Sequence, residues 1–389
     1  MKTMLHPLKI AVAMTAVFGL AACSESSTNP VDPTVLSARK IETPVAAGGV
    51  YTTTNGSSGN SVIGYARAAN GSLSSVGTFS TGGTGTGGTV DPLQSQYAVI
   101  LDHSNEYLYT VNAGSNDVSS FKVNGDASLT LLDRASSGGV RPVSLAQSGS
   151  LLYVLNAGDN TVGAVRITGG GKLVVVQNST RALTAGAAGT STIGVTPDGK
   201  WVIVTEIAAN RIETFAVEAN GRLGEPVVTV SSGGGPFGFD ITSTGHPIIS
   251  EAFGGAAPNG ALSSYTIGST GLLSTISASV DAMGRASCWV ILTANDRYAF
   301  VANSASDAIA SFSVSSSGTL TLLNATAAFT GTTTTPIDID FSEGDQYLYT
   351  LEARSGRVTG FTVSGGSLTS PTSVQAGAGS SGLQGIAAY

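Results

Sequence analysis

Glutamate and asparagine recur at one place in a short phrase that the chain repeats. The phrase closes a run of Val, Thr, Ile and aromatic residues, and it reads YTVN, YVLN, IVTE, IISE, FVAN and YTLE. Its last residues are the acids Glu206, Glu251 and Glu352 and the amides Asn112, Asn156 and Asn303. At the rim of a central channel, such side chains could bind a small hydroxylated ligand or a hard cation through oxygen atoms. The alternative is that they cap the backbone of the following turn, as Asn commonly does.

A second group of acids is spaced for acid–base chemistry. Asp338 and Asp340 alternate with isoleucines, so both carboxylates project from one face of a strand. Paired acids can exchange protons with a substrate when their pKa values are pushed apart. The commoner outcome is a buried acid that accepts hydrogen bonds from the backbone of a neighbouring repeat. Asp240, in a similar apolar run, is predicted to share that role.

The histidines and cysteines argue against the common catalytic and metal sites. His103 and His246 both fall in predicted turns, and neither is placed to activate a Ser or Cys nucleophile. Cys288 lies in an apolar run and is interpreted as a small buried residue rather than a reactive thiol. The Gly-rich stretch 82–88 lacks the helix that follows a phosphate- or dinucleotide-binding loop, and no Cys/His cluster is present. No metal motif and no cofactor are predicted.

The elements that position these residues follow from the repeat. Seven copies of the phrase recur from Tyr51 to Val363, separated by Gly-rich turns and β-branched runs. A period of about 49 residues built from short strands predicts an all-β, seven-bladed β-propeller over residues 45–389. In the third repeat, strands A to D, from the axis outward, are expected at residues 143–146, 151–155, 161–167 and 172–177. The final stretch, 382–389, is predicted to complete the first blade as its strand A.

The N-terminal residues predict export. Two lysines precede an apolar run at 10–20 that is too short to span a bilayer, so residues 1–22 are predicted to be a signal peptide. The sequence LAAC at 20–23 resembles the lipobox of bacterial lipoproteins, which implies lipidation of Cys23 and anchoring to the cell envelope. Ser24 favours the outer membrane. The alternative is an ordinary secretory signal in which the Cys is incidental.

Composition bounds the partners. Residues 23–44 are rich in Ser, Thr and Pro and are predicted to form a flexible tether. With Cys23 lipidated, Cys288 has no partner for an intramolecular disulfide. The net charge is −7, only 11% of residues are charged and no basic cluster occurs, which argues against nucleic acid as a partner. We expect a monomer that contacts the membrane through its lipid and binds a small polar ligand or a protein.

The repeated phrase and the closing Gly385-Ile386-Ala387-Ala388 resemble one known family. Residues 45–389 are similar to the seven-bladed lactonase family, which includes 6-phosphogluconolactonase-like and carboxymuconate-cyclising propellers with the YVTN repeat. The stretches 236–240, 249–252 and 288–290 resemble a secreted bacterial branch of that family. The repeat is specific for the fold and only weakly specific for any reaction.

The resemblance also implies where chemistry would lie. Catalytic members of the family use a His, two Arg and a Glu near the axis, on the face that carries the D–A and B–C loops. The aligned residues here are Ser191 for the His, Phe237 and Ile291 for the two Arg, and Glu251 for the Glu. Arg285, at the mouth of the strand that contains Ile291, could replace a lost cation.

Two functions are consistent with these residues. The first is a cell-envelope binding module that uses the family scaffold at its central-channel rim, and the replaced His and Arg positions favour it. The second is a lactonase-type hydrolase that opens a lactone of a sugar acid, with Glu251 as the acid–base group and Arg285 polarising the carbonyl. The retained Glu251 favours that alternative.

Overall fold

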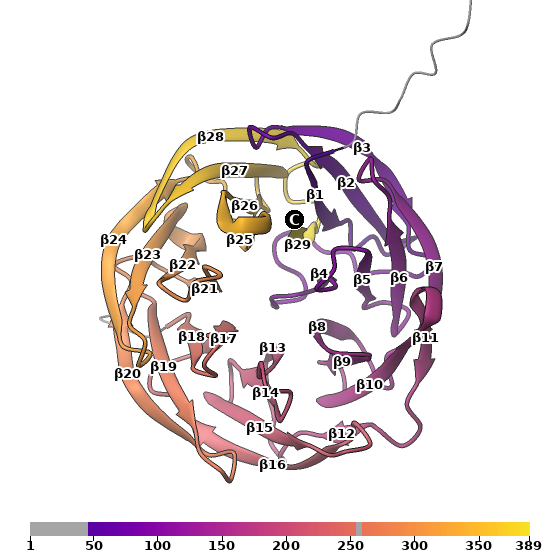
Figure 1. Ribbon diagram of the computed structural model, residues 1–389, viewed down its shortest axis with the longest axis vertical. Helices are drawn as coiled ribbons and strands as arrows, with labels where there is room; N and C mark the ends of the chain where they lie inside the picture. Colours follow the sequence, from indigo (N-terminus) through magenta and orange to yellow (C-terminus); the bar gives the residue numbers. More distant parts are fainter. Residues whose placement is uncertain (1–45, 254–258) are drawn as a thin grey trace, which may run out of the picture. The chain divides into compact units, whose positions relative to one another are not determined.

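The computed structural model describes residues 46–253 and 259–389, which form a ring of seven antiparallel β-sheets (Figure 1). The predicted seven-bladed β-propeller is therefore confirmed. By its internal contacts the chain divides into Met1–Thr43 and Pro44–Tyr389, and every described residue belongs to the second unit. The predicted signal peptide, the tether and Cys23 lie outside the described residues. No helix within the described ranges is long and apolar enough to cross a bilayer.

Each sheet is one blade, with strands A to D ordered from the axis outward. Blade 1 contains β29 (Gln384–Ala388), β1 (Gly48–Thr53), β2 (Ser61–Arg67) and β3 (Leu73–Ser80). Blade 2 contains β4 (Val99–Leu101), β5 (Tyr107–Asn112), β6 (Asp117–Val123) and β7 (Leu129–Ser136). Blade 3 contains β8 (Pro142–Ser148), β9 (Leu151–Asn156), β10 (Thr161–Thr168) and β11 (Lys172–Val175), and β12 (Arg181–Ala182) also pairs with β10.

The other four blades have the same order of strands. Blade 4 contains β13 (Thr190–Val195), β14 (Trp201–Glu206), β15 (Arg211–Val217) and β16 (Leu223–Val230), and blade 5 contains β17 (Pro236–Ile241), β18 (Pro247–Glu251), β19 (Ala261–Ile267) and β20 (Leu273–Asp281). Blade 6 contains β21 (Ser287–Leu292), β22 (Tyr298–Asn303), β23 (Ala308–Val314) and β24 (Leu320–Phe329). Blade 7 contains β25 (Pro336–Phe341), β26 (Tyr347–Glu352), β27 (Arg357–Ser364) and β28 (Ser367–Gln375). Short 3-10 turns lie at η1 (Gly169–Gly171), η2 (Ser304–Ser306) and η3 (Glu343–Asp345).

The C-terminal strand closes the ring. β29 pairs antiparallel with β1, with Val50 opposite Ala388 and Tyr51 opposite Ala387. In Figure 1 the yellow β29 lies beside the indigo β1 at the axis, so the two ends of the propeller share blade 1. This confirms the predicted closure, and it pairs an edge of β1 that would otherwise be open to other chains.

The predicted strands of blade 3 agree with the structure to within a few residues at their ends. The Gly/Thr stretch 81–89, which follows blade 1, is hydrogen-bonded to blades 1 and 2. Gly85 N donates to Gly56 O in blade 1, and Gly114 N of blade 2 donates to Thr84 O. The connection between β18 and β19 falls mostly outside the described residues, since 254–258 are not described.

Neighbouring blades are joined by one recurring hydrogen bond. In blades 1, 3 and 7, the first aromatic residue of the repeated phrase donates its hydroxyl to a carbonyl in the C–D turn of the next blade. The bonds are Tyr51 Oη to Ala127 O at 3.0 Å, Tyr153 Oη to Gly221 O at 3.0 Å and Tyr349 Oη to Gly71 O at 2.8 Å. In each case the residue opposite the Tyr on strand C is Gly or Ala, which leaves room for the ring.

Blades 2, 4 and 6 make the same connection with a different side chain. There the residue opposite on strand C carries a hydroxyl. The bonds are Ser120 Oγ to Gly171 O, Thr214 Oγ1 to Gly271 O and Ser311 Oγ to Gly366 O, all at 2.7 Å. The cross-strand pair therefore supplies one hydroxyl for the next blade, from strand B or from strand C.

Replacing Tyr153 with Phe tests this connection. The change leaves the buried Gly221 carbonyl without its donor, so we expect the free energy of unfolding to fall by about 1–3 kcal/mol. Tyr109→Phe is the matched control, because Tyr109 is equally buried and Ser120 makes the bond in its blade. Urea denaturation of both variants measures the difference, and equal losses would contradict the assignment.

Candidate functional site

Residues 91–97, between blades 1 and 2, cross the axis of the ring, and we name them the axial segment. Ser95 Oγ donates to Val143 O of blade 3 at 2.7 Å, and Ser191 Oγ of blade 4 donates to Gln94 O at 2.9 Å. Tyr97 Oη donates to Phe239 O of blade 5 at 3.0 Å. Inner strands from opposite sides of the ring are therefore joined through this segment.

The axial segment also contacts blades 6 and 1. Gln96 Nε2 donates to Val290 O at 2.8 Å, and Trp289 Nε1 donates to Ser95 O at 2.9 Å. From β29, Gln384 Nε2 donates to a carboxylate oxygen of Asp91 at 3.1 Å. Ser95 and Gln96 are fully buried. The segment thus fills the part of the channel that these strands enclose.

Sequence reasoning missed the axial segment, although the chain carries a signal for it. The connection from strand D to the next strand A covers residues 81–98 after blade 1 but only 137–141 after blade 2. The added length includes Leu93-Gln94-Ser95-Gln96, in which amide and hydroxyl groups follow an apolar residue. The length of the connection could have indicated an insertion, but its partners lie up to 293 residues away.

The positions aligned with the family's His and Arg lie against the axial segment or its partners. Ser191 is fully buried and hydrogen-bonds to Gln94 O. Phe237 packs edge-on against Trp289, with ring centroids 4.9 Å apart, and Trp289 in turn holds Ser95. Ile291, one of the inner residues of β21, is also buried. None of the three presents an ionisable group to the axis.

The three phrase-ending glutamates are buried inside blades. Glu251 accepts hydrogen bonds from Gly233 N, Ser263 Oγ and Ser279 Oγ at 2.8, 2.5 and 2.7 Å. Glu352 accepts from Ser355 Oγ and Thr359 Oγ1 at 2.7 and 2.6 Å. Glu206 accepts from Ala188 N at 3.0 Å and pairs with Arg211 Nε at 2.7 Å. These carboxylates connect strand ends and loops of their own blades.

The phrase-ending asparagines occupy the same place. Asn112 Nδ2 donates to Asp117 and Ser119, and Asn303 Oδ1 accepts from Ser287 Oγ. Asn156 donates long bonds of 3.3–3.4 Å, the shortest to Val154 O. All three are fully buried. The predicted exposure at the channel rim was therefore wrong for all six residues, because they end strand B and strand A stands between strand B and the axis.

The predicted pair of Glu251 and Arg285 is not brought together. Arg285 is exposed, and its Nη2 donates to Ala305 O at 2.9 Å. Glu251 is fully buried and its three donors come from its own blade and the loop before it. No ion pair joins them in the part of the chain that the structure describes. Across residues 46–253 and 259–389, no three His, Cys, Asp or Glu side chains gather to hold a metal ion.

The inner-strand aspartates join blades, as predicted. Asp240 accepts from Leu292 N of blade 6 at 2.9 Å, and Asp340 accepts from Ala388 N of blade 1 at 2.8 Å. Asp338 accepts from Ile386 N at 3.3 Å. Burial raises the pKa of Asp240 to about 6 and that of Asp340 to about 7, against partial compensation from these backbone donors.

These raised pKa values predict how stability changes with pH. An aspartate in the unfolded chain titrates near pH 4. Between about pH 4 and pH 7 the folded state therefore binds more protons than the unfolded state, so stability falls as pH rises through this window. We expect a lower melting temperature at about pH 8 than at about pH 5, measured by calorimetry.

Two variants assign the effect. Asp340→Asn removes one titrating group and should flatten the dependence. Asp133→Asn is the control: Asp133 is on an outer strand, and its pKa is lowered chiefly by the hydrogen bond from Leu173 N, so its titration lies below the window. A melting temperature that rises from pH 5 to pH 8 would contradict the assignment.

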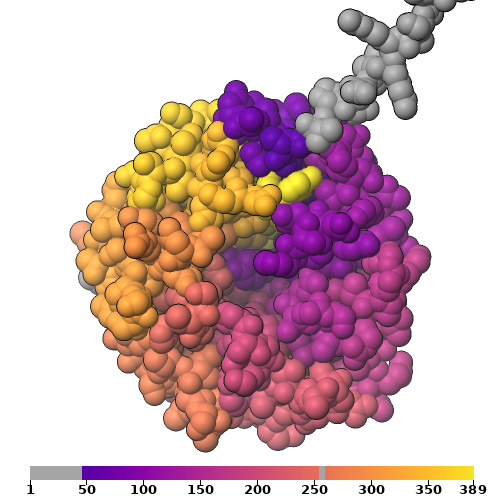
Figure 2. Space-filling view, in the orientation of Figure 1, coloured from indigo at the N-terminus to yellow at the C-terminus, as the bar shows by residue number. Residues whose placement is uncertain are grey.

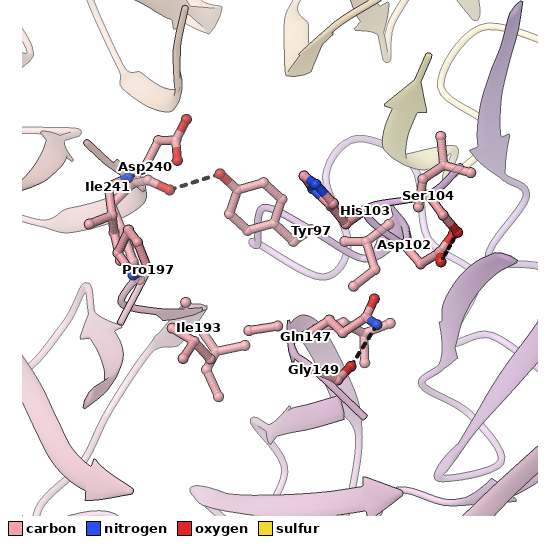
Figure 3. A pocket seen from close by; sticks show the side chains of 17 residues that line it. Tyr97, Asp102, His103, Ser104, Gln147, Gly149, Ile193, Pro197, Asp240 and Ile241 are labelled. Carbon is pink, nitrogen blue, oxygen red and sulfur yellow. Dashed lines mark hydrogen bonds between the residues drawn. The ribbon is translucent and has the colours of Figure 1, made fainter. Parts of the chain in front are cut away.

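A cavity of about 530 Å³ lies among the A–B turns, at the end of the channel opposite to the D–A and B–C loops. The axial residue Tyr97 stands in its middle, and strand ends of blades 2 to 5 form its wall (Figure 3). His103 lies in its wall, in the turn between β4 and β5, as the sequence predicted for that residue. The space-filling view in Figure 2 shows that the centre of the ring is hollowed.

A seven-bladed β-propeller with a chain segment across its axis is the class of protein that these observations define. The family model for lactonase, 7-bladed beta-propeller, matches residues 49–183, 147–290 and 263–380. This chain belongs to that lactonase family of seven-bladed propellers. No curated protein matches it by sequence.

Solved structures share the fold at low identity. A candidate 6-phosphogluconolactonase from Bacteroides fragilis is 17% identical with a TM-score of 0.68, covering 88% of this chain and 98% of its own. The periplasmic gluconolactonase of Pseudomonas aeruginosa is 19% identical with a TM-score of 0.63, covering 86% and 98%. A protein from Lactobacillus plantarum is 15% identical with a TM-score of 0.68, covering 88% and 99%.

Proposed function

We propose that this chain is a non-catalytic, ligand-binding member of the lactonase propeller family, held at the bacterial cell envelope. One observation carries the proposal. The axial segment occupies the channel beside the positions that align with the family's His and first Arg, and Ser191 is hydrogen-bonded to it. A lactone at this place would have to displace buried, hydrogen-bonded backbone, which is costly.

The residues around that place support the proposal. A lactonase needs a group within hydrogen-bond reach of the water or carbonyl, and a cation or donor that stabilises the developing charge. Phe237 and Ile291 carry neither, and Glu251 is fully buried with both carboxylate oxygens occupied by donors of the protein itself. Within residues 46–253 and 259–389, the exposed Arg285 forms no ion pair with an acid.

The alternative is a lactonase that opens an unphosphorylated sugar-acid lactone. It is favoured by the retained Glu251 and by the fold shared with a protein described as a periplasmic gluconolactonase. In that case Gly233, Ser263 and Ser279 would have to release the carboxylate of Glu251 before substrate could reach it. The two functions therefore make opposite predictions for hydrolysis.

Hydrolysis of a panel of unphosphorylated lactones tests the proposal. The protein is the soluble form that lacks residues 1–23 and keeps the whole propeller unit Pro44–Tyr389. We expect no turnover above the buffer rate, because Ser191, Phe237 and Ile291 supply no acid–base group at the positions of the family's His and Arg, and Glu251 is buried. A pH-stat assay measures it, with a known gluconolactonase as positive control.

Glu251→Gln and Arg285→Gln distinguish the alternatives. Glu251→Gln should lower the melting temperature, since Gln replaces one of two acceptor oxygens with a donor, but it should change no activity. Arg285→Gln should change neither stability nor activity much. Turnover by the unaltered protein that both changes reduce in a folded variant would establish the lactonase instead.

The envelope location rests on the lipobox-like LAAC at 20–23. We expect the full-length chain, expressed in a Gram-negative host, to partition into detergent and to sediment with outer membranes, with a diacylglyceryl mass on the N-terminal peptide. Cys23→Ser removes the acceptor thiol and should release the protein to the aqueous phase. Ser24→Ala keeps the thiol and serves as control. Aqueous partitioning of the unaltered protein would contradict the anchor.

A further inference from the structure

The channel has two ends with different chemistry. On the side of the D–A and B–C loops, the axial segment and the inner strands bury Ser191 and Phe237, which align with the family's His and first Arg. On the side of the A–B turns, the cavity of about 530 Å³ stays open among blades 2 to 5. That volume is within the range of small-molecule sites, roughly 300–1,000 Å³.

The wall of the cavity is mostly apolar. Ile100, Leu145, Ile193 and Phe239 line it from four successive inner strands. Tyr97 projects into its middle, and the hydrogen bond from Tyr97 Oη to Phe239 O holds the ring in place (Figure 3). A flat or branched apolar body can therefore be buried here against fixed side chains, with little ordering cost on the protein's side.

One polar group of the cavity is an acceptor without a donor. Gln147 Nε2 donates a hydrogen bond to Gly149 O at 2.9 Å. Gln147 Oε1 is buried and has no hydrogen-bond partner within the described residues. Asp240 and Asp102 add carboxylates to the wall. Every lining residue is described, and neither Lys nor Arg is among them. An unsatisfied buried acceptor costs about 1–3 kcal/mol, which a donor on a ligand would offset.

Above the raised pKa values of Asp240 and Asp340, a positive charge would be stabilised from several sides. Asp340 and Asp345 line the adjoining cavity of about 250 Å³, which shares Asp240 with the first. The only basic side chain in the wall of the larger cavity is the imidazole of His103. The face of the Tyr97 ring attracts a cation within about 6 Å of its centre. A carboxylate ligand would instead meet like charges in a partly desolvated site.

We propose that this cavity binds a small organic cation: an ammonium group on an aromatic or branched apolar body, with the ammonium near Gln147 Oε1. The inference rests on the proposed binding function and supplies its site and ligand class. It places the ligand at the A–B-turn end, in a cavity that neither Ser191 nor Phe237 lines. It also excludes sugar acids, which are anionic, and their lactones, which are polar over their whole surface.

Three probes that differ only in charge test the ligand class. They are naphthylethylammonium, naphthylethanol and naphthylacetate, titrated into the soluble form lacking residues 1–23 and followed by calorimetry and by protein NMR. We expect the ammonium to bind at least about 10-fold more tightly than the alcohol, and the acetate to show no saturable binding. Raising the salt concentration should weaken binding of the ammonium probe and leave binding of the alcohol probe unchanged.

Two variants locate the site. Val195→Phe fills the cavity from β13 and should weaken ammonium binding by about 10-fold or more, whereas Val174→Phe, on the outer strand β11, should have no effect. Gln147→Glu keeps the side-chain size and adds a negative charge, so it should tighten ammonium binding several-fold. Melting temperatures confirm that each variant is folded.

The outcomes are separable from those of the proposed function. Equal binding of ammonium and acetate, no binding of the ammonium, or an unchanged affinity in Val195→Phe would each overturn the cavity assignment. Lactone turnover would overturn the proposed function, whichever way the probes bind. Absence of lactone turnover together with absence of ammonium binding would contradict this inference alone.

Discussion

The fold depends on the hydrogen bond that six of the seven blades offer to the C–D turn of the next blade. A propeller has no single core. Each blade must therefore be aligned with the next one around the closed ring before the inner strands can pack. Tyr153 and Ser120 show the two ways of supplying that hydroxyl, from strand B or from the facing residue of strand C. Because each bond ends on a buried carbonyl, a blade that slips along its neighbour leaves that carbonyl unsatisfied.

The closed ring creates a second requirement at the axis, where seven inner strands leave room that must be filled or hydrated. Here residues of the chain itself fill one end, and their polar groups find partners on five blades, through contacts such as Ser95 to Val143 and Gln96 to Val290. A polar network of this kind is stable only when nearly every group is paired. The end that the axial segment leaves open then differs in chemistry from the end that it closes.

The same radial geometry explains the repeated glutamates and asparagines. Their place along the chain was predicted correctly, at the last residue of strand B. Their direction was not, because strand B is second from the axis and strand A screens it. The carboxylate of Glu251 therefore accepts hydrogen bonds from Gly233, Ser263 and Ser279. The turn-capping alternative describes the repeated glutamates and asparagines better than a ring of ligand-binding residues does. Family resemblance located Glu251 but could not indicate whether solvent reaches it.

Blade number, strand order and ring closure were determined by the sequence itself, because they follow from local periodicity and from an unpaired strand at each end. The inner aspartates were also predictable, since an acid in an apolar strand needs a backbone donor, and Asp240 and Asp340 have one. The axial segment, the burial of Glu251 and the cavity around Tyr97 were decided only by the tertiary structure. Each depends on groups far apart in the chain, such as Tyr97 and Phe239, that meet only when the ring has closed.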